Sequence, residues 1–186
     1  MRFAIFDIEA TQLKSDQGFL LCGGFKDIAT GKKTILGMRT VGVGKGRGRD
    51  HRLALAIRDH LESYDGIITW NGLMYDIPFL NDRLMFTGED IAEKRFHIDI
   101  MYQARMGRSA MTSSRLDWVA KAMGCPFVKT PLILNQWLDA ADEARSHWRE
   151  GHRNFDYIID HNNHDLDVTE WVYNRLKNRV QTISKR

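Results

Sequence analysis

Residues 3–10, FAIFDIEA, decide the fold, because an apolar run is followed at once by two acidic residues. The continuous apolar run from Phe3 to Phe6 is typical of a central strand that is buried on both faces. Asp7 and Glu9 lie two positions apart, so in a strand their side chains point to the same face. Neighbouring carboxylates repel each other unless a cation lies between them. Acidic residues in an otherwise buried strand therefore indicate a functional site.

The elements that surround this strand predict a layered α/β domain. Strands are predicted at 18–26 and 32–40, and with the first strand they form an antiparallel meander. A glycine-rich basic loop at 42–52 follows, with Asp50 expected to cap the next helix. Further strands are predicted at 66–70 and 96–100, and helices at 53–61, 77–86, 115–124, 133–150 and 155–180, with a frayed tail at 181–186. This order predicts a mixed sheet of meander and parallel strands, flanked by helices.

Length and composition limit the class of protein. A chain of 186 residues, 43% of them hydrophobic, fits a single domain spanning residues 1–186 with one sizeable core. The net charge of +3 favours a polyanionic partner only weakly. Cys22 and Cys125 form no CxxC pair, which is compatible with a reducing, cytoplasmic setting. No apolar run approaches the length that a membrane span needs, so no membrane association is expected.

Two further stretches carry acidic residues in suggestive positions. Residues 70–80, WNGLMYDIPFL, place Asp76 between a predicted strand and a predicted helix, where an ordinary helix cap is the alternative interpretation. Residues 160–176, DHNNHDLDVTEWVYNRL, place His161 and Asp165 four apart on one helical face, beside an apolar stripe. Asp160 and Asp167 are interpreted as residues of the solvated face of the same helix.

Taken together, the three stretches resemble the motifs of the DEDD (DnaQ-like) superfamily of 3′–5′ exonucleases. FDIEA matches the first motif, WNGLMYDIPFL the second and HNNHDLDVTEWVY the third, in the expected order. The resemblance spans nearly the whole chain and implies a ribonuclease H-like fold. It also implies a metal-dependent exonuclease that hydrolyses phosphodiester bonds at the 3′ end of single-stranded DNA or RNA, with DNA favoured. Replication or repair proteins are candidate partners.

The resemblance assigns the metal site to the carboxylates of Asp7, Glu9, Asp76 and Asp165. Hard oxygen ligands select Mg²⁺ or Mn²⁺, and the family implies two such ions. His161 is the candidate general base, because an imidazole has a suitable pKa and this one lies one turn before Asp165. The family usually has Tyr at this position or His one residue earlier, so the sequence departs from both subgroups and the identity of the base stays open.

The candidate substrate-binding residues are Asn71, Tyr75, Lys45, Arg47 and Arg49. The last three belong to the basic loop, which could clamp phosphates or could equally be a solvated connection. Two alternatives to the exonuclease remain: a structure-specific or ribonuclease H-type endonuclease of the same fold, and a nucleic-acid-binding module without catalytic activity.

Overall fold

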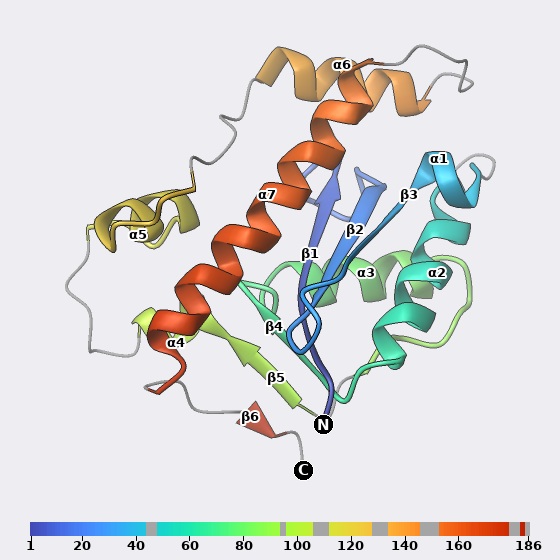
Figure 1. Ribbon diagram of the computed structural model, residues 1–186. Helices are drawn as coiled ribbons and strands as arrows, with labels where there is room; N and C mark the ends of the chain where they lie inside the picture. Colours follow the sequence, from blue (N-terminus) through green and yellow to red (C-terminus); the bar gives the residue numbers. More distant parts are fainter. Residues whose placement is uncertain are drawn as a thin grey trace.

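A six-stranded sheet forms the centre of the protein, in a computed structural model that describes residues 1–43, 48–93, 96–105, 112–127, 134–145, 153–178 and 183–184. The strands lie in the order β3-β2-β1-β4-β5-β6 (Figure 1). They are β1 (Phe3–Ala10), β2 (Leu20–Asp27), β3 (Lys33–Gly37), β4 (Gly66–Thr69), β5 (Phe96–Asp99) and β6 (Ile183–Ser184). The helices are α1 (Met38–Val41), α2 (His51–Glu62), α3 (Asp76–Met85), α4 (Ile100–Arg105), α5 (Leu116–Ala122), α6 (Leu134–Arg145) and α7 (Arg153–Leu176).

The sheet is mixed, as the order of elements in the sequence predicts. β1 pairs antiparallel with β2, and β2 antiparallel with β3, which confirms the meander. β1 pairs parallel with β4, and β4 parallel with β5, through connections that contain α2 and α3. β1 therefore has a strand on each side, which explains the continuous apolar run at its start.

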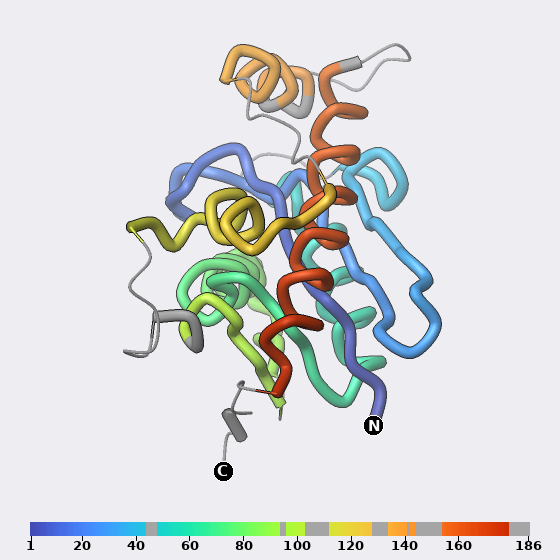
Figure 2. The backbone as a smooth tube through the Cα atoms, turned by 60° about the vertical axis from the view of Figure 1, so that its left-hand side comes forward, coloured from blue at the N-terminus to red at the C-terminus, as the bar shows by residue number. Residues whose placement is uncertain are grey.

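Helices cover both faces of the sheet. Alternate residues of β1, including Phe6 and Ile8, pack in one core cluster with α2 and α3. Ile5 points the other way and packs in a second cluster with Leu166 and Val172 of α7 and with residues of α5. Figure 2 shows α7 and α5 side by side, with α6 at the amino-terminal end of α7. The sheet thus lies between two helical layers.

Ion pairs tie α7 to the meander. Lys26 Nζ lies 2.8 Å from Asp167 and 2.5 Å from Glu170, and Lys33 Nζ lies 2.6 Å from Asp167. Asp167 is therefore half-buried between two lysines, and its assignment to the solvated face is wrong. Asp167 is paired because strands β2 and β3 place Lys26 and Lys33 beside α7. The helical pattern of the sequence alone does not show that these strands pack there.

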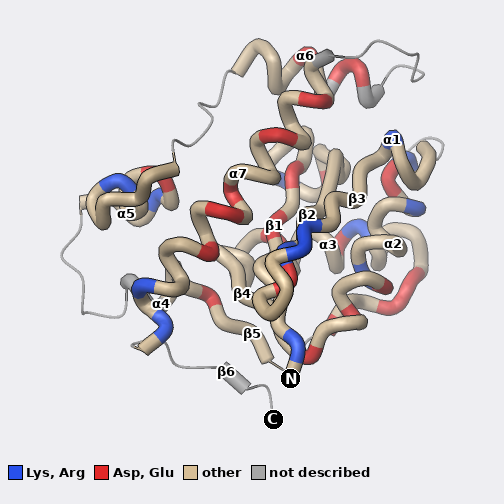
Figure 3. The backbone as a smooth tube through the Cα atoms, in the orientation of Figure 1, with Lys and Arg blue, Asp and Glu red and all other residues tan. Residues whose placement is uncertain are grey.

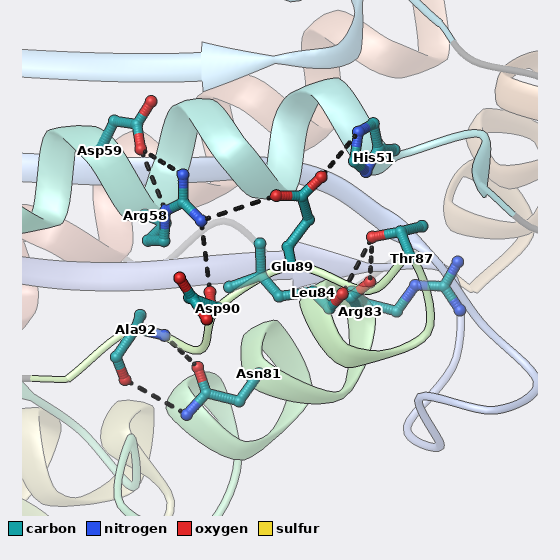
Figure 4. A network of polar contacts seen from close by, with 10 residues as sticks. All are labelled: His51, Arg58, Asp59, Asn81, Arg83, Leu84, Thr87, Glu89, Asp90 and Ala92. Atoms are coloured by element: carbon teal, nitrogen blue, oxygen red, sulfur yellow. Dashed lines mark hydrogen bonds and ion pairs between the residues drawn. The ribbon is translucent and has the colours of Figure 1, made fainter.

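Polar contacts join α2 to the segment that follows α3 (Figure 4). Glu89 reaches between Arg58 and His51, at 4.0 Å and 3.4 Å. Asn81 accepts a hydrogen bond from the backbone N–H of Ala92 and donates one to its carbonyl. These contacts hold together the helical layer opposite α7.

The structure also differs from the sequence-based expectation in the bounds of some elements and in the role of Asp50. The third strand ends at Gly37, and Met38–Val41 form the short helix α1. The segment after β5 forms α4, and Ile183–Ser184 pair with β5 rather than fraying. Asp50 makes no side-chain cap, because its carboxylate accepts two hydrogen bonds from Arg83 and one from the backbone of Leu20. Among the described residues, no helix is long and apolar enough to cross a membrane.

Candidate active site

Asp7 and Glu9 lie on the face of β1 that α7 covers. Ile5 belongs to the core cluster that contains Leu166 of α7, and residues at intervals of two along a strand share a face. Both acidic side chains are partly buried. Figure 3 shows acidic positions on β1 and at intervals along α7, two elements that contact each other. The expected shared face of the first motif is therefore present.

Asp76 reaches across to the same end of β1. It is the first residue of α3, it is 2% exposed, and its Oδ1 accepts a hydrogen bond of 3.0 Å from the backbone N–H of Ile8. β1 continues beyond the residues that pair with β4, and the carboxylate takes the place of a strand carbonyl. The interpretation of Asp76 as an ordinary helix cap is wrong, because the cap position is Tyr75 and no side-chain cap is made.

Burial changes the acidity of Asp76. The pKa of its carboxyl group is raised to about 7, mainly by desolvation and to a smaller extent by the negative charge of Asp99. The hydrogen bonds from the backbone of Ile8 and of Asp76 itself oppose the shift. A buried carboxyl group with such a pKa is typical of a functional site, and a cation beside it would favour the charged form.

A second buried carboxylate, Asp99 at the end of β5, holds the turn that precedes Asp76. Its oxygens accept hydrogen bonds from the backbone N–H groups of Asn71, Leu73 and Tyr102, at 3.0, 3.0 and 3.2 Å. Asn71 has a φ of 70°, a left-handed conformation that asparagine tolerates better than most residues. The turn is therefore held by a residue of β5, and it places the Asp76 carboxylate next to β1.

Tyr75 lies within the acidic region rather than projecting from it. Its ring is half-buried, 5.7 Å from the ring of Phe79, and its hydroxyl donates to the Gln12 carbonyl at 3.4 Å. Burial raises the pKa of the phenol, and the charges of Asp76, Glu9 and Asp7 raise it further. These three acids thus lie near one phenol, although they come from two different elements.

The third motif lies on α7, beside β1. Asp165 and His161 are both buried, with 3.9 Å between Asp165 Oδ2 and His161 Nε2. Asn162 donates from Nδ2 to Asp7 Oδ2 at 2.8 Å and so joins α7 to the first motif. His164 is exposed, and its Nδ1 lies 2.8 Å from the Asp160 carbonyl.

Trp137 of α6 covers His161. The two rings meet edge to face with their centroids 5.8 Å apart, and Tyr157 approaches the imidazole from α7 at 6.2 Å. The indole Nε1 donates to the carbonyl of Ala10, the last residue of β1, at 3.1 Å. α6 therefore bridges the end of β1 and the candidate base, which is only 4% exposed.

The candidate substrate-binding residues do not all fall in the described part. Lys45 and Arg47 lie outside the described residues. The guanidinium of Arg49 lies 6.0 Å from the ring centroid of Phe19, next to the segment that follows β1. Asn71 and Tyr75 belong to the turn before α3, and the structure places Tyr75 beside the acidic residues of β1.

The donor set suits a divalent cation in kind, although it forms no closed ligand shell. Among the described residues, no group of three or more His, Cys, Asp or Glu side chains is arranged to enclose a metal ion. The carboxylates of Asp7, Glu9 and Asp76 nevertheless lie near Tyr75, and Asn162 joins α7, the helix that carries Asp165, to Asp7. Hard carboxylate oxygens of this kind are the ligands that Mg²⁺ and Mn²⁺ prefer.

Sequence reasoning missed three residues of this region: Asn162, Asp99 and Trp137. Asn162 stands three residues before Asp165, a spacing that shares a helical face, but it lies in a run of polar residues that masks the signal. Asp99 ends a strand beside β4, at the edge of the sheet where ligands bind in α/β domains. Nothing in the sequence around Trp137 distinguishes it from the other tryptophans.

By its strand order and helical layers, the protein is an α/β domain with acidic residues at the end of its central strand. A model of the RNase_H superfamily matches residues 4–177, so the chain belongs to that superfamily. Its members are mostly nucleases, typically use divalent metals and act on nucleic acid. No curated protein matches the sequence.

A solved structure supports the fold. The chain is similar in structure to part of the family B DNA polymerase from the hyperthermophilic archaeon Pyrobaculum calidifontis, with a TM-score of 0.63 and 16% sequence identity. The match covers 95% of this chain but only 24% of the polymerase chain. At this identity the likeness shows the fold alone.

Proposed function

We propose that this protein is a metal-dependent 3′–5′ exonuclease of the DEDD type, acting on single-stranded nucleic acid with DNA as the favoured substrate. The observation that carries the proposal is the convergence of three motifs on one end of β1. Asp76 bonds to the backbone between Asp7 and Glu9, and Asn162, three residues before Asp165, bonds to Asp7. Motifs separated by more than half of the chain thus meet.

In the proposed mechanism, Asp7, Glu9, Asp76 and Asp165 hold two Mg²⁺ or Mn²⁺ ions. The ions would supply activation of water and stabilisation of charge on the departing 3′ oxygen. The protein contributes a partly buried site, in which each electrostatic contact is stronger than in bulk water. The raised pKa of Asp76 fits this role, because a bound cation would favour the charged form of its carboxyl group.

His161 is the proposed general base. Its Nε2 lies 3.9 Å from Asp165 Oδ2, and Trp137 and Tyr157 flank its ring. Because the side chain is 4% exposed, the water that it deprotonates would be held inside the site rather than arrive freely from bulk solvent. Asp165 would stabilise the imidazolium that forms when the proton is taken.

The turn before α3 is the proposed contact for the terminal nucleotide. Asn71 supplies an amide and Tyr75 a phenol that already lies among the acids. Lys45, Arg47 and Arg49 would bind phosphates further along the strand. Binding of this kind does not read sequence, so the proposed substrate is defined by its free 3′ end.

The decisive experiment uses single-stranded DNA and RNA of the same sequence, each labelled at the 5′ end. With Mg²⁺ or Mn²⁺ we expect a ladder of progressively shorter labelled products, faster on DNA. EDTA should abolish the ladder, and Asp7→Ala should reduce it by a factor on the order of 10³ or more, as for the loss of a principal charge-stabilising group. Full activity in EDTA would refute the metal mechanism, and immediate release of a labelled mononucleotide would refute the polarity.

An endonuclease of the same fold and a binding module without activity are the alternatives, and one substrate separates them. A circular single strand has no 3′ end, so an exonuclease leaves it intact and an endonuclease opens it. If the protein binds the labelled linear strand but cleaves it with none of the metals tried, the binding module is favoured.

A further inference from the structure

Asn162 is a fully buried amide in direct contact with Asp7. Its side chain is 0% exposed, and Nδ2 donates to Asp7 Oδ2 at 2.8 Å and to the Asp7 backbone carbonyl at 3.3 Å. One NH₂ group therefore bonds both the side chain and the main chain of the same residue. That double contact restricts the rotation of the carboxylate relative to β1.

Gly24 makes room for this contact. It lies opposite Asp7 in the register of β1 and β2. A Cβ atom at position 24 would stand 2.0 Å from Asn162 Oδ1 and 3.0 Å from Cδ1 of Leu166. No side chain other than hydrogen fits there while Asn162 keeps its place, so Asp7, Gly24 and Asn162 form one unit across two strands and a helix.

The unit is not optimised for stability. Asn162 Oδ1 is buried, and no donor among the described residues reaches it. A buried polar atom without a partner costs stability, and an interior glycine weakens a strand. An apolar residue at 162 and a β-branched residue at 24 would suit the sheet better, which points to a role other than folding.

We propose that Asn162 is a positioning residue that holds the Asp7 carboxylate in the orientation in which it binds a divalent cation. The inference rests on the proposed function. A free carboxylate loses rotational freedom when it binds a metal, and a carboxylate that is already held does not. The amide is also neutral, so it orients Asp7 without cancelling the negative charge that attracts the cation, as a lysine or arginine would.

Mn²⁺ binding to the metal-free protein tests this directly, with unbound Mn²⁺ measured by its electron paramagnetic resonance signal. Asn162→Ala should weaken binding by about 10–100-fold, the usual effect of losing a group that orients a metal ligand. Asn163→Ala is the matched control, because its backbone carbonyl, not its side chain, accepts the hydrogen bond from Lys33. This control should bind Mn²⁺ as the wild-type protein does.

Gly24→Ala gives an independent variant that keeps the amide but displaces it. We expect it to weaken Mn²⁺ binding as well, whereas in the Asn162→Ala background it should have no further effect, since the displaced group is gone. The double variant also fills part of the vacated space, which protects folding. Equal Mn²⁺ affinity of the folded double variant and the wild type would overturn the inference and leave the proposed function standing. A wild-type protein that binds no Mn²⁺ would overturn both.

Discussion

Asp76 is a carboxyl group that the fold buries almost completely. In the folded state its pKa is raised to about 7, mainly by desolvation, while in the unfolded chain it lies near the ordinary value of 3.8 for an aspartate side chain. Between these values the folded protein holds a proton that the unfolded chain releases. The free energy of unfolding therefore falls as pH rises from about 4 to about 7, and this loss persists above pH 7.

Asp76→Asn should remove this pH dependence in the metal-free protein. Because asparagine carries no charge, the variant should be more stable than the wild type at pH 8 by about 1–3 kcal/mol, and the difference should shrink towards pH 4. Thermal melts at a series of pH values, in EDTA, measure it. A constant difference across the series would mean that Asp76 is not the group responsible.

His161 and His164 provide a paired test of the third motif. If His161 is the base, His161→Ala should lower turnover by roughly 10²–10⁴-fold, the usual contribution of general acid–base catalysis. His164 is exposed and contacts the Asp160 carbonyl, so His164→Ala should have a mild effect. Mn²⁺ affinity should survive in both variants. The opposite ranking would mean that the register of the motif on α7 is wrong.

The ends of strands and helices carry the positioning devices of this site. The turn between β4 and α3 depends on Asp99, whose carboxylate accepts hydrogen bonds from the backbone N–H groups of Asn71 and Leu73 in this turn and of Tyr102 in α4. A carboxylate suits this task because it only accepts hydrogen bonds, whereas an amide would aim its own N–H groups at some of these donors. Asp99 therefore links β5 to the placement of Asp76, although it is not in the catalytic set.

Asp99→Asn should destabilise the protein by about 1–3 kcal/mol, because the amide keeps only one acceptor oxygen and a part-buried backbone N–H group loses its partner. Turnover should fall with it, since Asp76 depends on the same turn. Urea denaturation and the exonuclease assay measure the two effects. Asp59→Asn is the control, because Asp59 is exposed and forms an ion pair with the adjacent Arg58. Unchanged stability of Asp99→Asn would show that the turn between β4 and α3 does not depend on the Asp99 carboxylate.

Elements were predictable where the sequence pattern is long enough to show a period. The apolar run of β1 predicted the central strand, and the long apolar stripe of α7 predicted the helix that packs against it. The mixed sheet was predicted from the order of strands and helices along the chain. The short helices α1 and α4 span too few residues to show a helical period. β6 has two residues and forms by pairing with the edge strand β5. The local sequence of two residues does not predict such a pairing.

The candidate site was predictable from the sequence only where its residues belong to one element or one motif. Spacing places Asp7 and Glu9 on one face and Asp165 beside an apolar stripe, because these relations are local to one element. The contact between Asn162 and Asp7 joins residues 155 positions apart, and the cover of Trp137 over His161 joins α6 to α7. Such relations depend on how helices pack on the sheet, which a single sequence does not state.

At the scale of the whole molecule, association with a polyanion depends on where the positive charge lies, because the net charge is only +3. Lys45, Arg47 and Arg49 bring three positive charges into one short stretch of the chain. A protein that binds phosphates releases counterions, and for single strands the affinity falls with salt by about 0.7 log units per phosphate contact. Three such contacts would contribute a slope of about 2.

Replacing Lys45, Arg47 and Arg49 together by Ala should therefore weaken substrate binding and reduce the salt slope by about 2. Fluorescence anisotropy of a labelled single strand, measured from low to high salt in Ca²⁺ to prevent cleavage, gives both quantities. In the control, the exposed residues Lys32, Arg115 and Lys121 are replaced by Ala. This variant loses the same total charge, but from other parts of the surface. If charge acts only through the net field, both triple variants lower the affinity equally. If the loop contacts phosphates, only the first changes the slope, and an unchanged slope in that variant would make the loop a solvated connection.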